Sequence, residues 1–475
     1  MRNSHARSVF EHTTPMLSEE SGTVQTLAPA ESSEALYREY VNPQWARLLD
    51  ILRMNVRYTR CSGTTLYTDD GREILDFLSG YCVHNAGHNH PVIIEALEAE
   101  LRRQGPAMVQ SHVPDFAGQL AAELCSRAGG QVSKAFFCSS GSEGVEAAIK
   151  FARAHTKRSG LLYAEGAFHG LTTGALSLMG DDFWKDGFGP LLPDCHAVPF
   201  GDVEALRSKL ETERYAALVL EPIQGEGGIC VPAPEYLQEA QRLCRRYGTL
   251  LVLDEVQTGL ARTGKFLAGQ HYGVEPDMIV LAKALSGGLV PVGAVLMSDD
   301  VYRSVYSSLK RSIVHTSTYS ENSLAMRAGL ATLEVIDQES LAKRAERMGA
   351  YLRSKLQHAL RGYEMVKEVR GVGLFCGIEF SAPKQLKLRA AFEACRAIHA
   401  GLFGQIVVMN LFERDILTQM CGNNFMVLKA APPLVVHDSE IDRFVDAVKA
   451  VVESMHSSAS FWSDALGMAR RAVNI

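Results

Sequence analysis

In the stretch DMIVLAKALSGG, Asp277 to Gly288, a run of apolar residues ends in a lysine that is followed by small residues and glycines. The apolar run Met278–Ala282 predicts a short, buried β-strand. An ammonium ion at the end of a core strand is costly to bury, so we expect Lys283 to be paired, neutral or covalently bound. Which of these states it takes depends on the residues that the fold brings beside it.

The same pattern recurs along the chain, where apolar strands alternate with amphipathic helices from Gly71 onward. Strand, loop, helix and strand in this order predict a mostly parallel sheet covered by helices, the arrangement of α/β proteins. Other runs that we interpret as strands of this sheet are KAFFC (134–138), YAALVL (215–220), TLLVLD (249–254) and PVGAVLM (291–297).

From about Ser340 onward the pattern changes to a long polar helix, a strand pair over residues 366–380 and a helix over residues 386–399. We interpret this part as a smaller α+β domain appended to the large one. Residues 1–32 contain Ser, Thr, Glu and Pro with few periodic apolar positions, which is typical of a mobile extension. The expected division is a mobile N-terminal extension (1–32), a segment that contributes to the small domain and the active site (33–100), a large domain (101–335), a small C-terminal domain (336–455) and a C-terminal tail (456–475).

The composition is that of a globular protein, because 47% of the 475 residues are hydrophobic and can form a large core. Lysine and arginine total 48 against 54 acidic residues, and the net charge of −6 gives no electrostatic reason to expect nucleic acid as a partner. The 10 cysteines are scattered without CxxC spacing, which favours neither zinc nor disulfides and is typical of a reducing cytosol. The first residues, MRNSHARSVFEHTTPMLSEESG, lack an apolar stretch of signal-peptide type, and the uncharged run from Ala284 to Ser298 is too short to span a membrane, so we expect a cytoplasmic protein without a transmembrane segment.

Polar residues stand where the predicted strands end, at the edge where α/β sheets place their ligand sites. In FFCSSGSEGVEAAIKFAR (136–153) a strand runs into a Ser/Gly loop that opens onto a helix, and the free N–H groups of such a helix start suit a phosphate. Taken alone, a segment of this kind is more often a helix cap without a ligand. The P-loop spacing is absent, and RGVGLFCG (370–377) does not match the GxGxxG fingerprint of dinucleotide sites.

Asp254 and Lys283 follow neighbouring predicted strands and would meet at the same edge of the sheet. On their own, the two residues could form a buried salt bridge. With a phosphate site nearby they match the needs of pyridoxal 5'-phosphate, which requires a lysine for its Schiff base, an acid beside its pyridine nitrogen and an anchor for its phosphate. The three features together therefore predict a site for this cofactor.

These motifs are similar to those of the class III, fold-type I pyridoxal phosphate aminotransferases, the group that contains the ornithine and acetylornithine aminotransferases. The likeness extends over most of the chain, and its most specific parts are LDEVQTGLARTGKF (253–266) and AKALSGG (282–288). The resemblance implies ping-pong transamination between an amine donor and a carbonyl acceptor, with Lys283 as the Schiff-base lysine and proton shuttle. Asp254 would pair with the pyridine nitrogen of the cofactor.

The resemblance also implies further contacts to the cofactor. Gly141 and Ser142 in SSGSEG would hold its phosphate, and Phe168 in AFHG would stack on its ring. Gln257 would form a hydrogen bond with its phenolic oxygen. Thr318 in HTSTYSEN matches the threonine that reaches the phosphate of the neighbouring subunit, so the resemblance implies an obligate homodimer.

The residues expected around the substrate both match the family and depart from it. Tyr81 and Glu226 stand where ornithine aminotransferases carry residues that favour a terminal amine. Lys429 and Leu171, in contrast, stand where the family usually has arginines. Arginine binds a carboxylate with a planar fork, whereas lysine is a point charge on a flexible stem, so the exchange is not neutral. We therefore expect a more apolar substrate pocket than that of ornithine aminotransferase.

The reading that these observations favour is an ω-aminotransferase, with ornithine-like amines, diamines and larger biosynthetic aldehydes as candidate substrates. An aminomutase or racemase on the same scaffold is the alternative, and a cofactor-binding protein without enzymatic activity is a third hypothesis. The two histidines of GHNHP (87–91) lie in a turn that the family has without a metal, so we expect no metal site.

Overall fold

The computed structural model describes residues 30–109, 111–457, 461–463, 467–468 and 471. Most of the expected N-terminal extension, and part of the expected C-terminal tail, lie outside the described residues. The chain divides into two compact units, of which one ends at Asp50 and the other begins at Ile51. In the first unit, Arg38 of helix α1 (Ala30–Tyr40) forms an ion pair with Asp50 of helix α2 (Pro43–Ile51).

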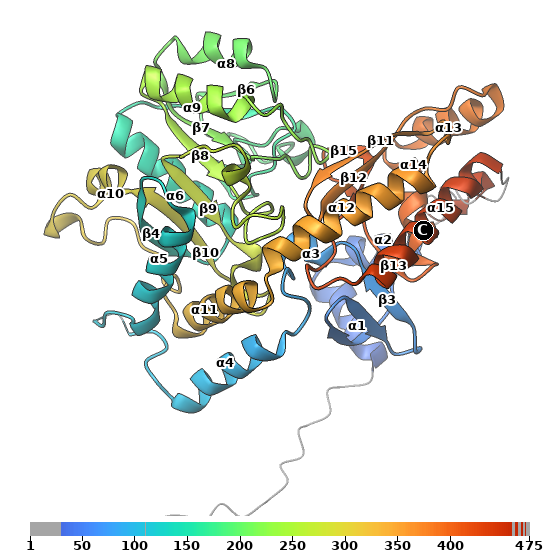
Figure 1. Ribbon diagram of the computed structural model, residues 1–475, viewed down its shortest axis with the longest axis horizontal. Helices are drawn as coiled ribbons and strands as arrows, with labels where there is room; N and C mark the ends of the chain where they lie inside the picture. Colours follow the sequence, from blue (N-terminus) through green and yellow to red (C-terminus); the bar gives the residue numbers. More distant parts are fainter. Residues whose placement is uncertain (1–29, 110, 458–460, 464–466, 469–470, 472–475) are drawn as a thin grey trace, which may run out of the picture. The chain divides into compact units, whose positions relative to one another are not determined.

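A seven-stranded sheet forms the centre of the second unit, with the strand order β4-β10-β9-β8-β7-β5-β6. Strand β10 runs antiparallel to both of its neighbours, and the strands from β9 to β6 are parallel to one another. This mostly parallel sheet, drawn in teal to yellow in Figure 1, confirms the expectation from the sequence. Its strands are β4 (Val132–Cys138), β5 (Gly160–Ala164), β6 (Cys195–Val198), β7 (Tyr215–Leu220), β8 (Leu250–Asp254), β9 (Met278–Leu281) and β10 (Gly293–Ser298).

Alternate residues of the central strands point to opposite faces of the sheet, and helices cover both faces. In β7, Ala217 and Val219 belong to a core that includes α6 (Gly141–Thr156) and α10 (Asp299–Val305). Leu218 and Leu220 belong to another core, with α8 (Val203–Leu210) and α9 (Tyr236–Tyr247). This burial on both faces explains why the strands are continuous apolar runs. The remaining helices of this part are α4 (Pro91–Arg103), α5 (Asp115–Ala128), α7 (Thr173–Leu176), α11 (Ser323–Gln338) and the short 3-10 helices η1 (Asp182–Trp184), η2 (Ala268–His271), η3 (Lys283–Ser286) and η4 (Leu309–Arg311).

Two smaller sheets complete the second unit. An antiparallel sheet of order β11-β12-β15-β14 contains the expected strand pair, now β11 (Val366–Val372) and β12 (Phe375–Phe380). In the other sheet, of order β1-β2-β3-β13, β13 pairs in parallel with β3 although the two strands are distant in the sequence. The other elements of these parts are β1 (Tyr58–Ser62), β2 (Thr65–Thr68), β3 (Glu73–Asp76), β13 (Ile416–Leu417), β14 (Met420–Cys421), β15 (Asn424–Ala430), α3 (Ser79–Cys82), α12 (Leu341–Ala359), α13 (Leu386–Ile398), α14 (Leu402–Phe412) and α15 (Asp438–Ser457).

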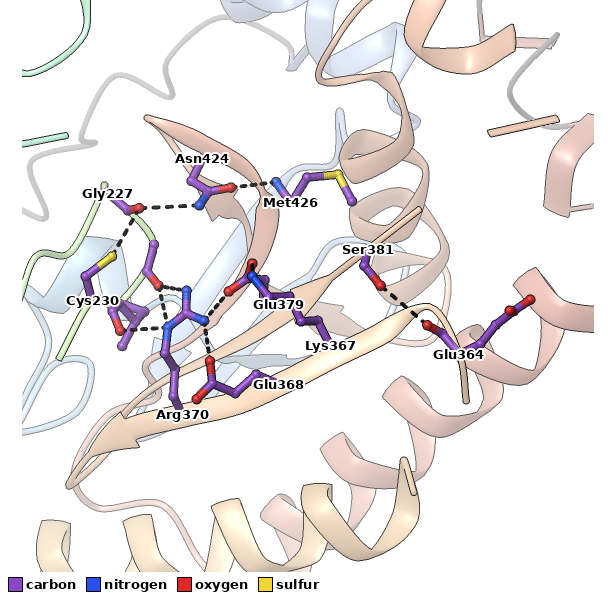
Figure 2. Close-up of polar contacts among 12 residues, drawn as sticks. Gly227, Cys230, Glu364, Lys367, Glu368, Arg370, Glu379, Ser381, Asn424 and Met426 are labelled. Atoms are coloured by element: carbon purple, nitrogen blue, oxygen red, sulfur yellow. Dashed lines mark hydrogen bonds and ion pairs between the residues drawn. The ribbon is translucent and has the colours of Figure 1, made fainter. Parts of the chain in front are cut away.

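A group of polar contacts joins the sheet that contains β11 to the loop after β7 (Figure 2). The guanidinium of Arg370, on β11, donates hydrogen bonds to the carbonyl oxygen atoms of Gly228 and Ile229 and forms ion pairs with Glu368 and Glu379. Arg370 therefore fixes the loop after β7 against the strand pair.

Helices α13 and α14 follow one another with a sharp bend. Helix α14 is buried along its whole length. Among the residues that the structure describes, we find no single helix with both the length and the apolar composition to cross a membrane. In the described part of the chain, one pair of helices, Leu388–Ile398 and Leu402–Phe412, reaches this length and composition together, with a bend of 103° between the two helices.

The two histidines of the GHNHP turn contact different carboxylates. His88 Nε2 lies 2.7 Å from Asp76 Oδ2, and His90 Nε2 lies 2.8 Å from Glu339 Oε1. These contacts account for both histidines as structural groups. Within the described part of the chain, we find no group of three or more His, Cys, Asp or Glu side chains that could hold a metal ion.

Candidate active site

The carboxyl ends of the central strands surround a cavity of about 510 Å³. Its wall comes from segments that follow β4, β5, β7, β8 and β9, as expected for the ligand site of such a sheet. The structure therefore brings together six of the residues that the sequence singles out, namely Gly141, Ser142, Phe168, Asp254, Gln257 and Lys283.

The first turn of α6 forms one wall of this cavity. Ser140 caps the helix, because its hydroxyl accepts a hydrogen bond from Glu143 N–H, and the helix begins at Gly141. Gly170 packs directly against this turn, because a Cβ at Gly170 would come within 2.2 Å of Ser142 Oγ. Free N–H groups and the positive end of the helix dipole face the cavity at this point, which suits an anion such as a phosphate.

A buried histidine holds Asp254 in place. His169 Nδ1 lies 2.8 Å from Asp254 Oδ2, and Val256 N–H donates to Asp254 Oδ1 over 3.1 Å. Burial opposes protonation of His169, but the hydrogen bond and the charge of Asp254 outweigh it and raise the pKa of His169. No role for His169 was predicted from the sequence, where its position directly after Phe168 is the one signal that could have suggested this contact.

Lys283 begins η3, directly beyond β9, and faces the cavity. Its φ of 47° lies in the left-handed region, which is strained for a residue with a side chain. Burial lowers the pKa of Lys283, and the nearby charges of Cys82, Asp254 and Glu226 only partly oppose this effect. A larger share of neutral amine makes the lysine a better nucleophile and base.

A second cavity, of about 490 Å³, adjoins the first, because Phe168, Gln257 and Lys283 line both. Tyr81 and Glu226 lie in its wall, together with Leu171. Much of the remaining wall is aromatic or apolar, and the sequence analysis assigned none of these residues to the site. They are Phe183, Trp184, Met420 and Phe425.

Among the described residues around this cavity, Glu226 and Lys429 form the one buried ion pair. Lys429 Nζ lies 2.5 Å from Glu226 Oε1, and the lysine side chain is 0% exposed. Gln257 Nε2 and Gly422 N–H also donate to the Glu226 carboxylate, over 2.9 and 2.7 Å. Burial alone would raise the pKa of Glu226, but the charge and hydrogen bond of Lys429 outweigh it and lower this pKa to about 2.

Thr318 lies apart from the other predicted site residues. It lines a separate cavity of about 250 Å³, formed by segments that include Phe116 and Ile313. Neither of the two cavities around Lys283 includes Thr318. A role for Thr318 at the cofactor of the same chain is therefore not supported by its position.

A family model described as aminotransferase class-III matches residues 50–452. The chain belongs to the class III aminotransferases. Similar proteins include aminotransferase PigE from a Serratia species, 38% identical over 451 residues, which are 88% of this chain and 53% of PigE. This chain thus spans about half the length of PigE. Putrescine aminotransferase from Pectobacterium atrosepticum is 36% identical over 436 residues, which are 89% of this chain and 88% of that protein.

Solved structures of other aminotransferases resemble this class III enzyme over most of its length. The ornithine aminotransferase from Toxoplasma gondii superposes with a TM-score of 0.78 and 31% identity, over 91% of this chain and 97% of that one. An (S)-enantioselective omega-transaminase from Thermomicrobium roseum superposes with a TM-score of 0.79 and 29% identity, over 91% of this chain and 100% of that one. These likenesses confirm the fold-type I architecture and an aminotransferase activity, and they do not favour the aminomutase or racemase alternative.

Class III aminotransferases use pyridoxal 5'-phosphate, and the residues of this class III enzyme fit that cofactor. The cavity is large enough for such a molecule, and the start of α6 suits its phosphate. His169 Nε2 and Gln257 Oε1 are buried without a hydrogen-bond partner in the part of the chain that the structure describes. Polar groups of this kind in a cavity wall are suited to a polar ligand.

Proposed function

We propose that this aminotransferase moves an amino group between a terminal amine and a carbonyl acceptor by a ping-pong mechanism, with Lys283 as its Schiff-base lysine. The observation that carries this proposal is the arrangement of three features around one cavity. Lys283, the Asp254 carboxylate and the N-terminus of α6 all line it. A lysine, an acid and an anion site are the three groups that pyridoxal phosphate requires.

Pyridoxal phosphate, when bound, supplies a carbonyl group for the incoming amine and a ring that takes up electrons from a broken C–H bond. In the proposed mechanism, Lys283 Nζ would accept the proton of the substrate carbon that carries the amine and would pass this proton to the cofactor. The lowered pKa of Lys283 supports this role, because only a neutral amine can accept a proton.

The other residues would bind and orient the cofactor. We propose that Asp254 holds a proton on the pyridine nitrogen and that Phe168 stacks on the ring. Gln257 would contact the phenolic oxygen, and the N–H groups at Gly141 and Ser142 would bind the phosphate. The support is that all of these residues line the same cavity as Lys283.

We also propose an assembly, a location and a domain organisation. A homodimer in which Thr318 reaches the phosphate site of the partner is supported by the position of Thr318, which lines a cavity other than the one around Lys283 of its own chain. A cytoplasmic location is supported by the cysteines, which are all free thiols. The central sheet falls within the proposed large domain of residues 101–335, and β11 to β15 fall within the proposed small domain of residues 336–455.

The experiment that tests this function is an absorption scan of the purified protein with added amines. The panel is ornithine, acetylornithine, putrescine, glutamate, alanine and a long-chain terminal amine. We expect at least one amine to convert the visible band of the lysine-bound cofactor into the band of its aminated form. Lys283→Ala should lack the visible band, whereas Lys367→Met, which removes an exposed lysine, should keep it. A visible band that survives in Lys283→Ala would overturn the assigned lysine.

A further inference from the structure

The second cavity has a rigid aromatic wall. Trp184 Nε1 donates a hydrogen bond to Asn423 Oδ1 over 2.8 Å, and the Asn423 amide in turn donates to the carbonyl oxygen of Gly166 over 3.0 Å. The Trp184 ring also meets the Phe168 ring edge to face, with centroids 5.4 Å apart. These contacts fix the indole ring in position, so the cavity presents a preformed apolar surface.

Charge at this cavity is confined to few groups. Among the described residues that line it, Glu226 is the one carboxylate and Lys283 is the one Lys, Arg or His residue, and Lys283 is the proposed Schiff-base lysine. Glu226 is fully engaged by Lys429, Gln257 and Gly422 N–H. A carboxylate that entered the cavity would therefore find no free cation at this end.

Tyr81 encloses the Lys429 ammonium from another side, with its ring centroid 4.9 Å from Lys429 Nζ. A strained turn holds this tyrosine, because the residues from Ser79 to Cys82 have φ values of 47°, 61°, 61° and 68°. Such backbone persists only where its surroundings fix it. Here Asp76 Oδ1 accepts hydrogen bonds from the N–H groups of Leu78 and Ser79, over 2.8 and 2.7 Å.

The loop that carries Glu226 is held from two directions. Arg370, Gly377 and Lys429 lie opposite one another on β11, β12 and β15, so their side chains share one face of the sheet. Arg370 binds the carbonyl oxygen atoms of this loop at Gly228 and Ile229, while Lys429 binds the Glu226 side chain. Gly377 between them leaves room for Ile229, since a Cβ there would lie 3.1 Å from Ile229 Cβ.

We propose that the closed Glu226–Lys429 pair makes the second cavity select amine donors and carbonyl acceptors with an uncharged, apolar chain, and reject those with a carboxylate at the far end of that chain. This inference rests on the proposed function, because it takes the second cavity as the place of the substrate chain. An entering carboxylate loses its hydration, is repelled by Glu226 and gains nothing from Lys429, which is buried behind Glu226 and already neutralised by it. An apolar chain instead gains free energy by burying its surface against the aromatic wall.

A binding experiment with two unreactive ligands of the same shape tests the selection independently of turnover. Isothermal titration calorimetry of the full-length holoprotein compares hexanamide, which is uncharged, with hexanoate. We expect hexanamide to bind at least about tenfold more tightly, the scale on which an unpaired buried charge weakens binding. Equal binding, or tighter binding of hexanoate, would overturn the proposal.

Two variants test the role of the pair. Glu226→Gln keeps the shape of the side chain but releases the charge of Lys429, so the preference for hexanamide should fall by about tenfold or reverse. Tyr81→Leu opens a second side of Lys429 and should shift the preference in the same direction, which keeps the test valid if the first variant does not fold. Lys367→Met is the matched control, because it removes a lysine from an exposed ion pair with Glu379 on the same sheet. An unchanged ligand preference in both cavity variants contradicts the inference.

A different measurement, the absorption of the cofactor, tests the proposed function. If no amine alters the absorption of the cofactor, the transamination proposal is wrong whatever the calorimetry shows. If hexylamine and 6-aminohexanoate both alter it equally well, transamination stands and the selection is wrong. Conversion of hexylamine alone, with hexanamide bound more tightly than hexanoate, supports both proposals.

Discussion

Glu221 and Glu226 lie in the same loop after β7, and both are buried, but their surroundings give them opposite tendencies to ionise. Each accepts a hydrogen bond from a backbone N–H group, Glu221 from Gly225 and Glu226 from Gly422. Desolvation raises the pKa of Glu221 to about 7. The pKa of Glu226 is lowered to about 2, because Lys429 outweighs the same desolvation.

The difference shows that burial alone does not set the charge of these carboxylates. A cation within hydrogen-bond distance decides it, and only Glu226 has one. The two lysines show the same contrast, since Lys429 has a direct carboxylate partner and a raised pKa, whereas burial lowers the pKa of Lys283. The surroundings of Asp254 and Lys283 are thus suited to moving protons. The surroundings of Tyr81 instead keep the Glu226–Lys429 ion pair closed.

The largest effect is expected from the removal of Lys429, the cation that distinguishes Glu226 from Glu221. Lys429→Met leaves Glu226 buried without its cation, and we expect the free energy of unfolding to fall by about 3–5 kcal/mol. Denaturant unfolding at neutral pH measures this loss. The matched control is Lys367→Met, which removes the lysine of an exposed pair with Glu379 and should change stability by less than about 1 kcal/mol. Equal losses in the two variants would show that the buried pair carries no special stability.

The second prediction concerns the charge of Asp254, in the cavity around Lys283. Asp254→Asn keeps the shape of the side chain but removes its charge, and we expect turnover to fall by about a hundredfold to a thousandfold. Steady-state kinetics measures this effect. Near-normal turnover would contradict the role that we propose for Asp254.

The third prediction concerns the pH dependence of stability. The folded-state pKa of Glu221 lies above the ordinary value of 4.5, so its contribution to stability is complete below about pH 4.5 and is lost as the pH rises through about 7. Its size is about 3 kcal/mol, from the free energy that corresponds to such a shift. In Glu221→Gln, the free energy of unfolding should therefore fall less between pH 4.5 and 7 than in the unchanged protein.

The slope against pH, not the absolute stability, is the quantity to compare for Glu221→Gln. Glutamine has one carbonyl oxygen, so it can lose one of the two backbone hydrogen bonds that Glu221 accepts from Phe168 and Gly225. That loss shifts stability by the same amount at every pH and leaves the slope unchanged. A slope equal to that of the unchanged protein would mean that Glu221 titrates normally.

The local pattern of the sequence was sufficient to predict the central sheet and the position of its ligand site. Apolar runs that end in Asp254 and Lys283, and a Ser/Gly loop before a helix, identify strand ends without any knowledge of distant contacts. The strand pair over residues 366–380 was predictable for the same reason, since it is formed by strands that are neighbours in the sequence. The roles of the individual site residues, Thr318 included, stay predictions.

The contacts between buried charged residues depend on the tertiary structure. His169 contacts Asp254, and Glu226 contacts Lys429, although each pair is far apart in the sequence. The aromatic wall likewise combines segments from different parts of the chain, such as Trp184 and Phe425. Charge states and pocket shape depend on distances through space, and a local pattern of residues carries no information about these distances. The local sequence therefore predicted the central sheet and the strand ends that carry Asp254 and Lys283, whereas the charge of each buried carboxylate and lysine depends on the folded chain.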